Sequence, residues 1–205
     1  MAISQDRLGG ALVLVGLPET EDAFLRTMAT PESYSAQFTL GGWPRYVHQW
    51  VGPLKRFTSR VGQFGVDTVC EASLCGIGSC VALKPYSSIL LISHWTSDGI
   101  ELSDGFARPS DICDQLPLEF TGIVDLCICH PIDLFHQMRT SRPLCSIRYT
   151  PQKVRPEYWL IFYESLFRLC ASGHHSYGSA WELLAASLVS GRTISTAVSG
   201  SQRGK

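Results

Sequence analysis

The sequence predicts an α/β fold with a mostly parallel central sheet and helices on both faces. Residues 89–93 and 123–128 are almost continuously apolar, which is typical of parallel strands that are covered on both faces. The segment between them is long enough for the crossover that parallel neighbours require, and residues 109–115 within it predict a short helix. Strands therefore alternate with helices, which indicates a layered α/β architecture.

Local patterns predict the remaining elements. Residues 11–15 (ALVLV) are a short, branched apolar run closed by Gly16 and Pro18, and they predict the first strand. Residues 144–149 alternate apolar and polar side chains in the manner of a strand. Segments that we expect to be helical, or mixed in the case of the first two, are residues 46–57, 68–83, 156–170 and 177–189.

Length and composition indicate one domain. The chain has 205 residues, of which 45% are hydrophobic and 17% charged, whereas about 25% of residues are charged in an average protein. A large core is therefore expected, and no Pro/Gly/Ser-rich linker divides it, so we expect a single domain over residues 1–189. Residues 190–205 are small, polar and lightly basic, and they predict a flexible tail.

Several classes of partner are disfavoured. The formal net charge is -1, and no run of Lys and Arg alternates with aromatic residues, so we expect no nucleic-acid partner. The longest apolar runs, residues 11–15 and 89–92, are too short to span a bilayer, so we expect no membrane association. The first residues lack the basic and apolar regions of a signal peptide, which favours a cytoplasmic protein.

The sequence contains eight cysteines, which we expect to be reduced in a cytoplasmic chain of this size. Reduced thiols leave room for a catalytic one. A zinc site built from Cys127, Cys129, His130 and His136 is disfavoured, because this cluster lacks a second ligand pair at a usual spacing. No phosphate-binding glycine motif follows a strand, so we expect neither a metal nor a cofactor.

A histidine and a cysteine carry the chemistry of the predicted fold. His94 directly follows the strand at residues 89–93, and Cys129 directly follows the strand at residues 123–128. Open α/β sheets place their functional sites at the carboxyl ends of strands. If the two strands are neighbours, they lie about 4.8 Å apart, which brings the two side chains into reach. This arrangement predicts a catalytic dyad in which Cys129 is the nucleophile and His94 handles the proton.

The flanking sequence resembles a known family at these residues. LLISHWTSDGIELSDG is similar to the histidine block of CHAT domains, a branch of the caspase-like cysteine proteases, and GIVDLCICHP is similar to their cysteine block. The later segment FYESLFRLCASGHHSYGSAWELLAAS resembles the closing helices, so the likeness covers roughly residues 88–187. The resemblance implies a caspase-like three-layer sandwich, a protein substrate, and control by a regulatory or sensor protein.

The resemblance also implies cleft residues. Trp95 stands where the family commonly has the glycine whose amide helps to hold the oxyanion, and the next glycine is Gly99. We expect the backbone amides near Trp95 and Cys129 to fill this role. Asp98, Glu101 and Asp104 form an acidic loop that we interpret first as a solvated turn and second as a wall of the substrate cleft.

Two alternatives remain open. Cys127 could be the nucleophile, with Asp125 two residues before it, but the apolar run ends at Cys129, which favours Cys129 at the rim of the sheet. Related metacaspases have an aspartate two residues before the cysteine for a basic substrate residue, and here that position is Cys127, so no cleavage preference carries over. The second alternative is a catalytically silent caspase-like interaction subunit, which Trp95 in place of glycine favours.

Overall fold

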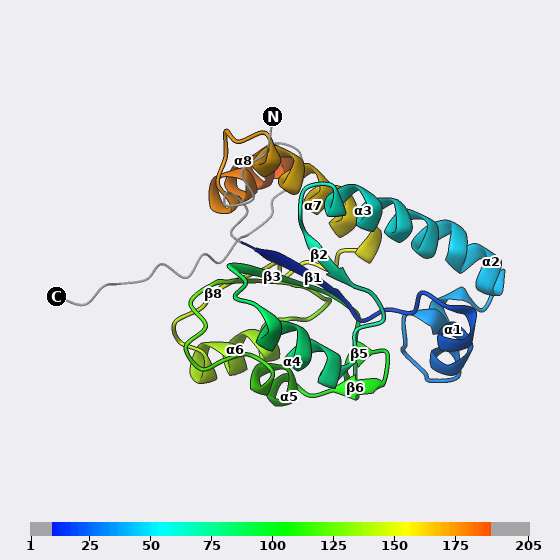
Figure 1. Cartoon of the computed structure of the whole chain (residues 1–205). Coiled ribbons are helices and arrows are strands. Elements are labelled where there is room, and N and C mark those ends of the chain that lie inside the picture. The colour runs from blue at the N-terminus through cyan, green and yellow to red at the C-terminus, as the bar shows by residue number, and fades with distance from the viewer. Residues whose placement is uncertain (1–9, 190–205) are drawn as a thin grey trace.

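The computed structural model describes residues 10–189, apart from the side chains of residues 187–189. A central sheet separates two layers of helices, with α3, α7 and α8 on one side of the strands and α4, α5 and α6 on the other (Figure 1). This arrangement confirms the predicted α/β class and its three layers. The predicted flexible tail at residues 190–205 lies outside the described residues.

The central sheet has five strands in the order β2-β1-β3-β7-β8. Every neighbouring pair is parallel, and β3 pairs with β7 so that Ile92 lies opposite Cys127. The two strands that carry the predicted dyad are therefore adjacent, as the sequence predicts. The strands are β1 (Ala11–Val15), β2 (Asp67–Val69), β3 (Ser88–Ile92), β7 (Ile123–Cys127) and β8 (Ser146–Tyr149).

The helices and helical turns are divided between the two layers. The layer on the side of α3 and α7 contains α1 (Glu21–Met28), the 3-10 turn η2 (Ser35–Phe38), α2 (Gly42–Tyr46), the π-helical turn η3 (Val47–Val51), α3 (Gly52–Gly62), α7 (Pro156–Ala171) and α8 (Tyr177–Val189). The opposite layer contains α4 (Leu74–Leu83), α5 (Pro109–Asp114) and α6 (Ile132–Ser141).

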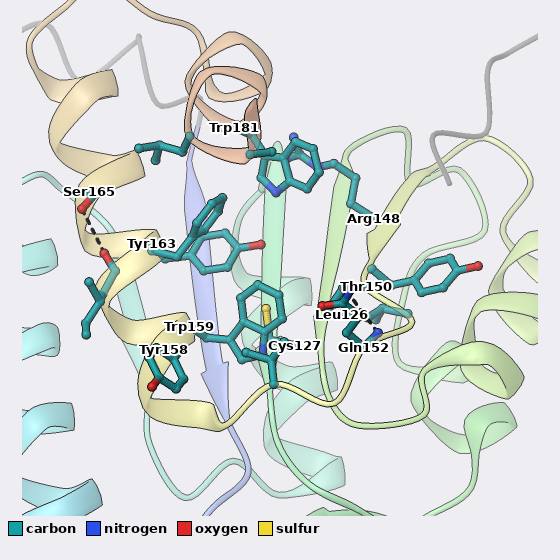
Figure 2. Close-up of a pocket in the computed structure, with 16 residues that line it drawn as sticks. Leu126, Cys127, Arg148, Thr150, Gln152, Tyr158, Trp159, Tyr163, Ser165 and Trp181 are labelled. Atoms are coloured by element: carbon teal, nitrogen blue, oxygen red, sulfur yellow. Dashed lines mark hydrogen bonds between the residues drawn. The ribbon is translucent and has the colours of Figure 1, made fainter. Parts of the chain in front are cut away.

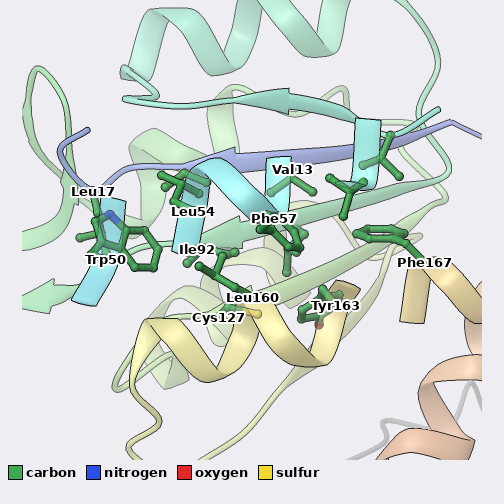
Figure 3. Close-up of a cluster of buried hydrophobic side chains, with 14 of the residues drawn as sticks. Val13, Leu17, Trp50, Leu54, Phe57, Ile92, Cys127, Leu160, Tyr163 and Phe167 are labelled. Atoms are coloured by element: carbon green, nitrogen blue, oxygen red, sulfur yellow. The ribbon is translucent and has the colours of Figure 1, made fainter. Parts of the chain in front are cut away.

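Alternating side chains of the strands supply the two cores. Val13 and Ile92 face α3 and α7, where they pack with Phe57, Leu160 and Tyr163 (Figure 3). Their sequence neighbours on β1 and β3 belong to the second cluster, below α4, α5 and α6. Full burial of one such aliphatic or aromatic side chain contributes about 1.5–3 kcal/mol. Because both faces are apolar, the strands read as continuous apolar runs in the sequence.

A small antiparallel sheet follows β3 and was not predicted. It consists of β4 (Trp95–Thr96), β5 (Gly99–Leu102) and β6 (Gly105–Ala107) in that order. Its middle strand corrects one interpretation, because Glu101 is fully buried instead of lying in a solvated turn. The Glu101 amide donates to the His94 carbonyl at 2.9 Å, and its own carbonyl accepts the Ser93 hydroxyl. The acidic segment therefore ties the small sheet to the end of β3.

The other predicted elements agree with the structure to within about two residues, apart from residues 46–57 and 68–83. The first of these segments belongs to a longer helical region that runs from α2 through η3 to the end of α3 at residue 62. The second segment divides into β2 and α4, because Ser73 caps the helix by accepting from the amide of Gly76 at 3.0 Å. The polar stretch before residue 46 contains α1, which was not predicted and whose first turn is capped by Thr20, with the Thr20 side chain accepting from the Ala23 amide. Within residues 10–189, no helix is long and apolar enough to cross a membrane.

Candidate active site

Cys129 and His94 line one cavity at the carboxyl ends of β7 and β3. Each lies two residues beyond the last residue of its strand. Hydrogen bonding between the two strands continues one residue past the end of β3, where the Ser93 amide donates to the Cys127 carbonyl at 3.3 Å. The cavity has a volume of about 420 Å³. Its lining consists of Glu32, Ser33, Ala36, Gln37, His94, Trp95, Cys129, His130 and Lys153.

A backbone carbonyl orients the His94 ring. His94 is only 7% exposed, and its Nε2 lies 3.0 Å from the carbonyl oxygen of Glu32. A carbonyl only accepts hydrogen bonds, so Nε2 carries the proton, and Nδ1 is the basic nitrogen of the neutral imidazole. The side-chain amide of Gln37 lies 3.5 Å from the same Nε2. In this tautomer Nδ1 is the ring nitrogen that could accept a proton as a general base.

The backbone of Glu32 is held in an uncommon conformation. Its φ is 68°, a left-handed value that is rare outside glycine, asparagine and aspartate. Its carboxylate accepts from the amide of Ser97 at 2.8 Å, which anchors residue 32 to the turn after β4. Two residues later, the Tyr34 amide donates to the buried Glu101 carboxyl at 2.9 Å. These contacts hold the carbonyl of Glu32 against the ring.

Cys129 sits in a bend directly after β7. The residue is 6% exposed, and its sulfur lies 3.9 Å from the carbonyl oxygen of Val154. His130, the next residue, has a left-handed φ of 53°. A non-glycine residue in this region stores strain, which is common where a side chain must be held in a defined orientation. The bend turns the chain away from the sheet and leaves Cys129 at the cavity.

The protonation state of the pair follows from its burial. Burial lowers the pKa of the His94 imidazole. The hydrogen bond to the Glu32 backbone raises this pKa in part, whereas the positive charge of Lys153 lowers it further. Burial also raises the pKa of the Cys129 thiol, and the charge of Lys153 and a backbone hydrogen bond with Val154 offset part of that rise. Both directions favour a neutral thiol and a neutral imidazole in the resting site.

Of the other predicted cleft residues, only Trp95 lines the cavity. Asp98 and Asp104 are exposed, and the Asp104 carboxylate accepts from the amide of Leu74 at 3.1 Å, which places it at the start of α4. Gly99 is buried in β5 with φ 131°, and a Cβ there would lie 2.5 Å from the Ala107 carbonyl oxygen. Gly99 is thus needed for the pairing of β5 with β6.

The alternative nucleophile lies in a different environment. Cys127 is buried among the side chains of the α7 layer and lines a second cavity of about 260 Å³, mostly apolar, below α7 and α8 (Figure 2). Asp125 is also buried, where Arg148 donates to its carboxylate at 2.7 Å and the Tyr177 hydroxyl at 2.6 Å. Within the described part of the chain, neither Cys127 nor Asp125 lines the cavity that contains His94.

Sequence reasoning missed one wall of the cavity. The segment at residues 32–37 approaches His94 from about 60 positions away in the chain, and Lys153 approaches from the loop after β8. Neither segment contains a sequence motif or a hydrophobic periodicity that would have placed it near His94. A left-handed Glu32 leaves no signal in the sequence, since glutamate is not a residue that favours this conformation.

Among residues 10–189, no three His, Cys, Asp or Glu side chains lie close enough together to hold a metal ion. Comparison of the sequence with protein-family models finds no match, and comparison with curated proteins finds none either. The likeness of the histidine and cysteine blocks to caspase-like proteases therefore stays a prediction from the residues themselves.

Proposed function

We propose that the protein is a cysteine endopeptidase that cleaves a protein substrate through Cys129 and His94. The observation that carries the proposal is their meeting in one cavity at the carboxyl ends of adjacent parallel strands. The resemblance to CHAT-type caspase-like proteases supports the same pair. We further propose that the protein works in the cytoplasm, where Cys129 stays reduced, and that a regulatory or sensor protein controls it.

The chemistry follows from the neutral resting pair. His94 Nδ1 accepts the thiol proton as the sulfur of Cys129 attacks the carbonyl carbon of the scissile peptide bond. The backbone amides of Trp95 and Cys129 are the proposed donors to the oxyanion. The carbon–nitrogen bond then breaks, the amine leaves with the proton held by His94, and a thioester remains on Cys129. Water hydrolyses the thioester, with His94 as base, and restores the thiol.

Digestion of a denatured-protein or peptide library tests the proposal. Wild-type protein should cleave, whereas Cys129→Ala and His94→Ala should each lose cleavage and keep the circular-dichroism spectrum of the wild type. Cys127→Ser is the matched thiol control and should stay active, because Cys127 lines a different cavity. Cleavage by pure Cys129→Ala protein, or its loss in Cys127→Ser alone, would contradict the assignment.

A catalytically silent interaction subunit is the second candidate. The observation in its favour is that Cys129 and His94 are both neutral at rest, because burial raises the pKa of the thiol and lowers that of the imidazole. A thiol without a preformed negative charge is a weak nucleophile. Labelling with a thiol-reactive peptidyl ketone separates the two candidates, since only the protease should form a covalent adduct at Cys129.

A further inference from the structure

A smaller cavity adjoins the cleft that contains Cys129 and His94. Its volume is about 110 Å³, and its lining consists of Tyr34, Gln37, Phe38, Arg45, Gln49, Arg155 and Glu157. Gln37 lines both cavities, and the ring centroids of Tyr34 and His94 are 5.8 Å apart. The small cavity is therefore next to the reacting groups, and its size suits one side chain of a bound peptide.

Glu157, one of the residues that line this cavity, has a carboxylate oxygen without a hydrogen-bond donor within residues 10–189. The Tyr34 hydroxyl donates to Oε1 of Glu157 at 2.8 Å. The other oxygen, Oε2, is buried and has no hydrogen-bond donor among the described residues. A buried acceptor without a donor costs about 1–3 kcal/mol, and more when it is charged. A ligand that donates a hydrogen bond to Oε2 would recover this cost.

The same cavity also contains two guanidinium groups. Arg45 donates to the carbonyl of Leu40 at 3.2 Å, and Arg155 is exposed. Neither forms an ion pair with a carboxylate in the part of the chain that the structure describes. Guanidinium groups are strong donors without any acceptor capacity. The cavity thus offers an acceptor on one residue and donors on two others.

We propose that this cavity binds an uncharged amide side chain, asparagine or glutamine, of the substrate residue next to the scissile bond. An amide has an N–H₂ group that can donate to Glu157 Oε2 and a carbonyl that can accept from Arg155 or Arg45. A carboxylate in the same place would face Glu157, and an ammonium would face the two arginines. This inference rests on the proposed peptidase function, because it assigns that site's substrate preference.

Peptide binding to the Cys129→Ala protein tests the preference without requiring cleavage. The probes are fluorescein-labelled Ala-Ala-Ala-Xaa-Ala-Ala peptides, with Asn, Gln, Asp, Lys or Leu at Xaa, and the readout is fluorescence polarisation. The Asn and Gln peptides should bind about tenfold or more tightly than the Asp, Lys and Leu peptides. Each of these three side chains would leave at least one charged or buried polar group of the cavity without a partner. Equal affinities, no binding, or tighter binding of Asp or Lys would each overturn the inference.

Two variants test which residues read the amide. Glu157→Gln should move the preference toward Asp, and Arg155→Met should move it toward Lys. Glu119→Gln and Arg56→Met change exposed residues of the same types outside the cavity, and they should leave the preference unchanged. Cleavage of the library by wild-type protein tests the peptidase proposal separately, so cleavage after Asp or Lys would refute the inference alone.

Discussion

The buried carboxyl of Glu101 should make the protein less stable as the pH rises. Burial raises its pKa from 4.5 to about 7, and the hydrogen bond from the Tyr34 amide offsets only part of that effect. The folded state therefore holds a proton more tightly than the unfolded state, so the free energy of unfolding falls as the pH rises from 4.5 through 7. The expected loss between pH 5 and pH 8 is about 2.5 kcal/mol, at about 1.4 kcal/mol for each pH unit of the window.

Replacement of Glu101 by glutamine isolates this effect. The amide oxygen of Glu101→Gln can accept from the Tyr34 amide, and the side chain stays neutral at every pH. Urea unfolding at pH 5, 6, 7 and 8, followed by tryptophan fluorescence, gives the free energy of unfolding for each protein. The difference between wild type and variant should shift by about 2.5 kcal/mol in favour of the variant from pH 5 to pH 8.

The exposed Glu119→Gln variant is the control, and its unfolding free energy should keep the wild-type dependence on pH. Parallel curves for wild type and Glu101→Gln would refute the reasoning. That result would mean that Glu101 remains ionised in the folded state, and that the hydrogen bond from the Tyr34 amide is enough to stabilise the charge.

Two further predictions concern the ion pair below α8 and the thiol. Arg148→Met should lower the free energy of urea unfolding by about 3–5 kcal/mol, because it leaves the buried Asp125 without its cation. Arg168→Met removes an exposed cation from Glu164, which keeps Arg60 as a partner, and should cost less than about 1 kcal/mol. Equal costs for the two variants would contradict the difference in burial between the two pairs. The alkylation rate of Cys129 by iodoacetamide, measured by peptide mass spectrometry, should keep rising above pH 8, because its pKa is raised, and Lys153→Met should slow it further. A plateau below pH 7 would show a preformed thiolate.

The central strands could be predicted because both of their faces are buried. Such strands need apolar residues at every position, and the runs at β1, β3 and β7 contain them. The small sheet could not be predicted, because its strands are two to four residues long and carry polar side chains. Glu101 illustrates the reason, since its burial depends on contact with the Tyr34 segment, and no local pattern reports that contact.

The site was predictable to a similar degree. A residue at the end of a predicted parallel strand has a definite place, so the positions of His94 and Cys129 followed from the strands alone. Their surroundings did not, because the partners of His94 come from a segment about 60 positions away. The acidic residues in the turns after β4 and β5 were natural cleft candidates, yet the lining of the cavity includes neither Asp98 nor Asp104. Proximity in sequence was therefore a poor guide to the walls of the cleft.

The contact between His94 and the main chain of Glu32 has a consequence for mutational scanning. Because the orienting group is a carbonyl, every substitution at position 32 retains it, and truncation to alanine reports only the loss of the carboxylate. The sensitive variable is the backbone angle. Substitutions should therefore sort by conformational preference and not by charge, with glycine and asparagine tolerated and valine, isoleucine and proline disruptive. A tolerance profile of that shape would reveal a functional main-chain group that alanine scanning passes over.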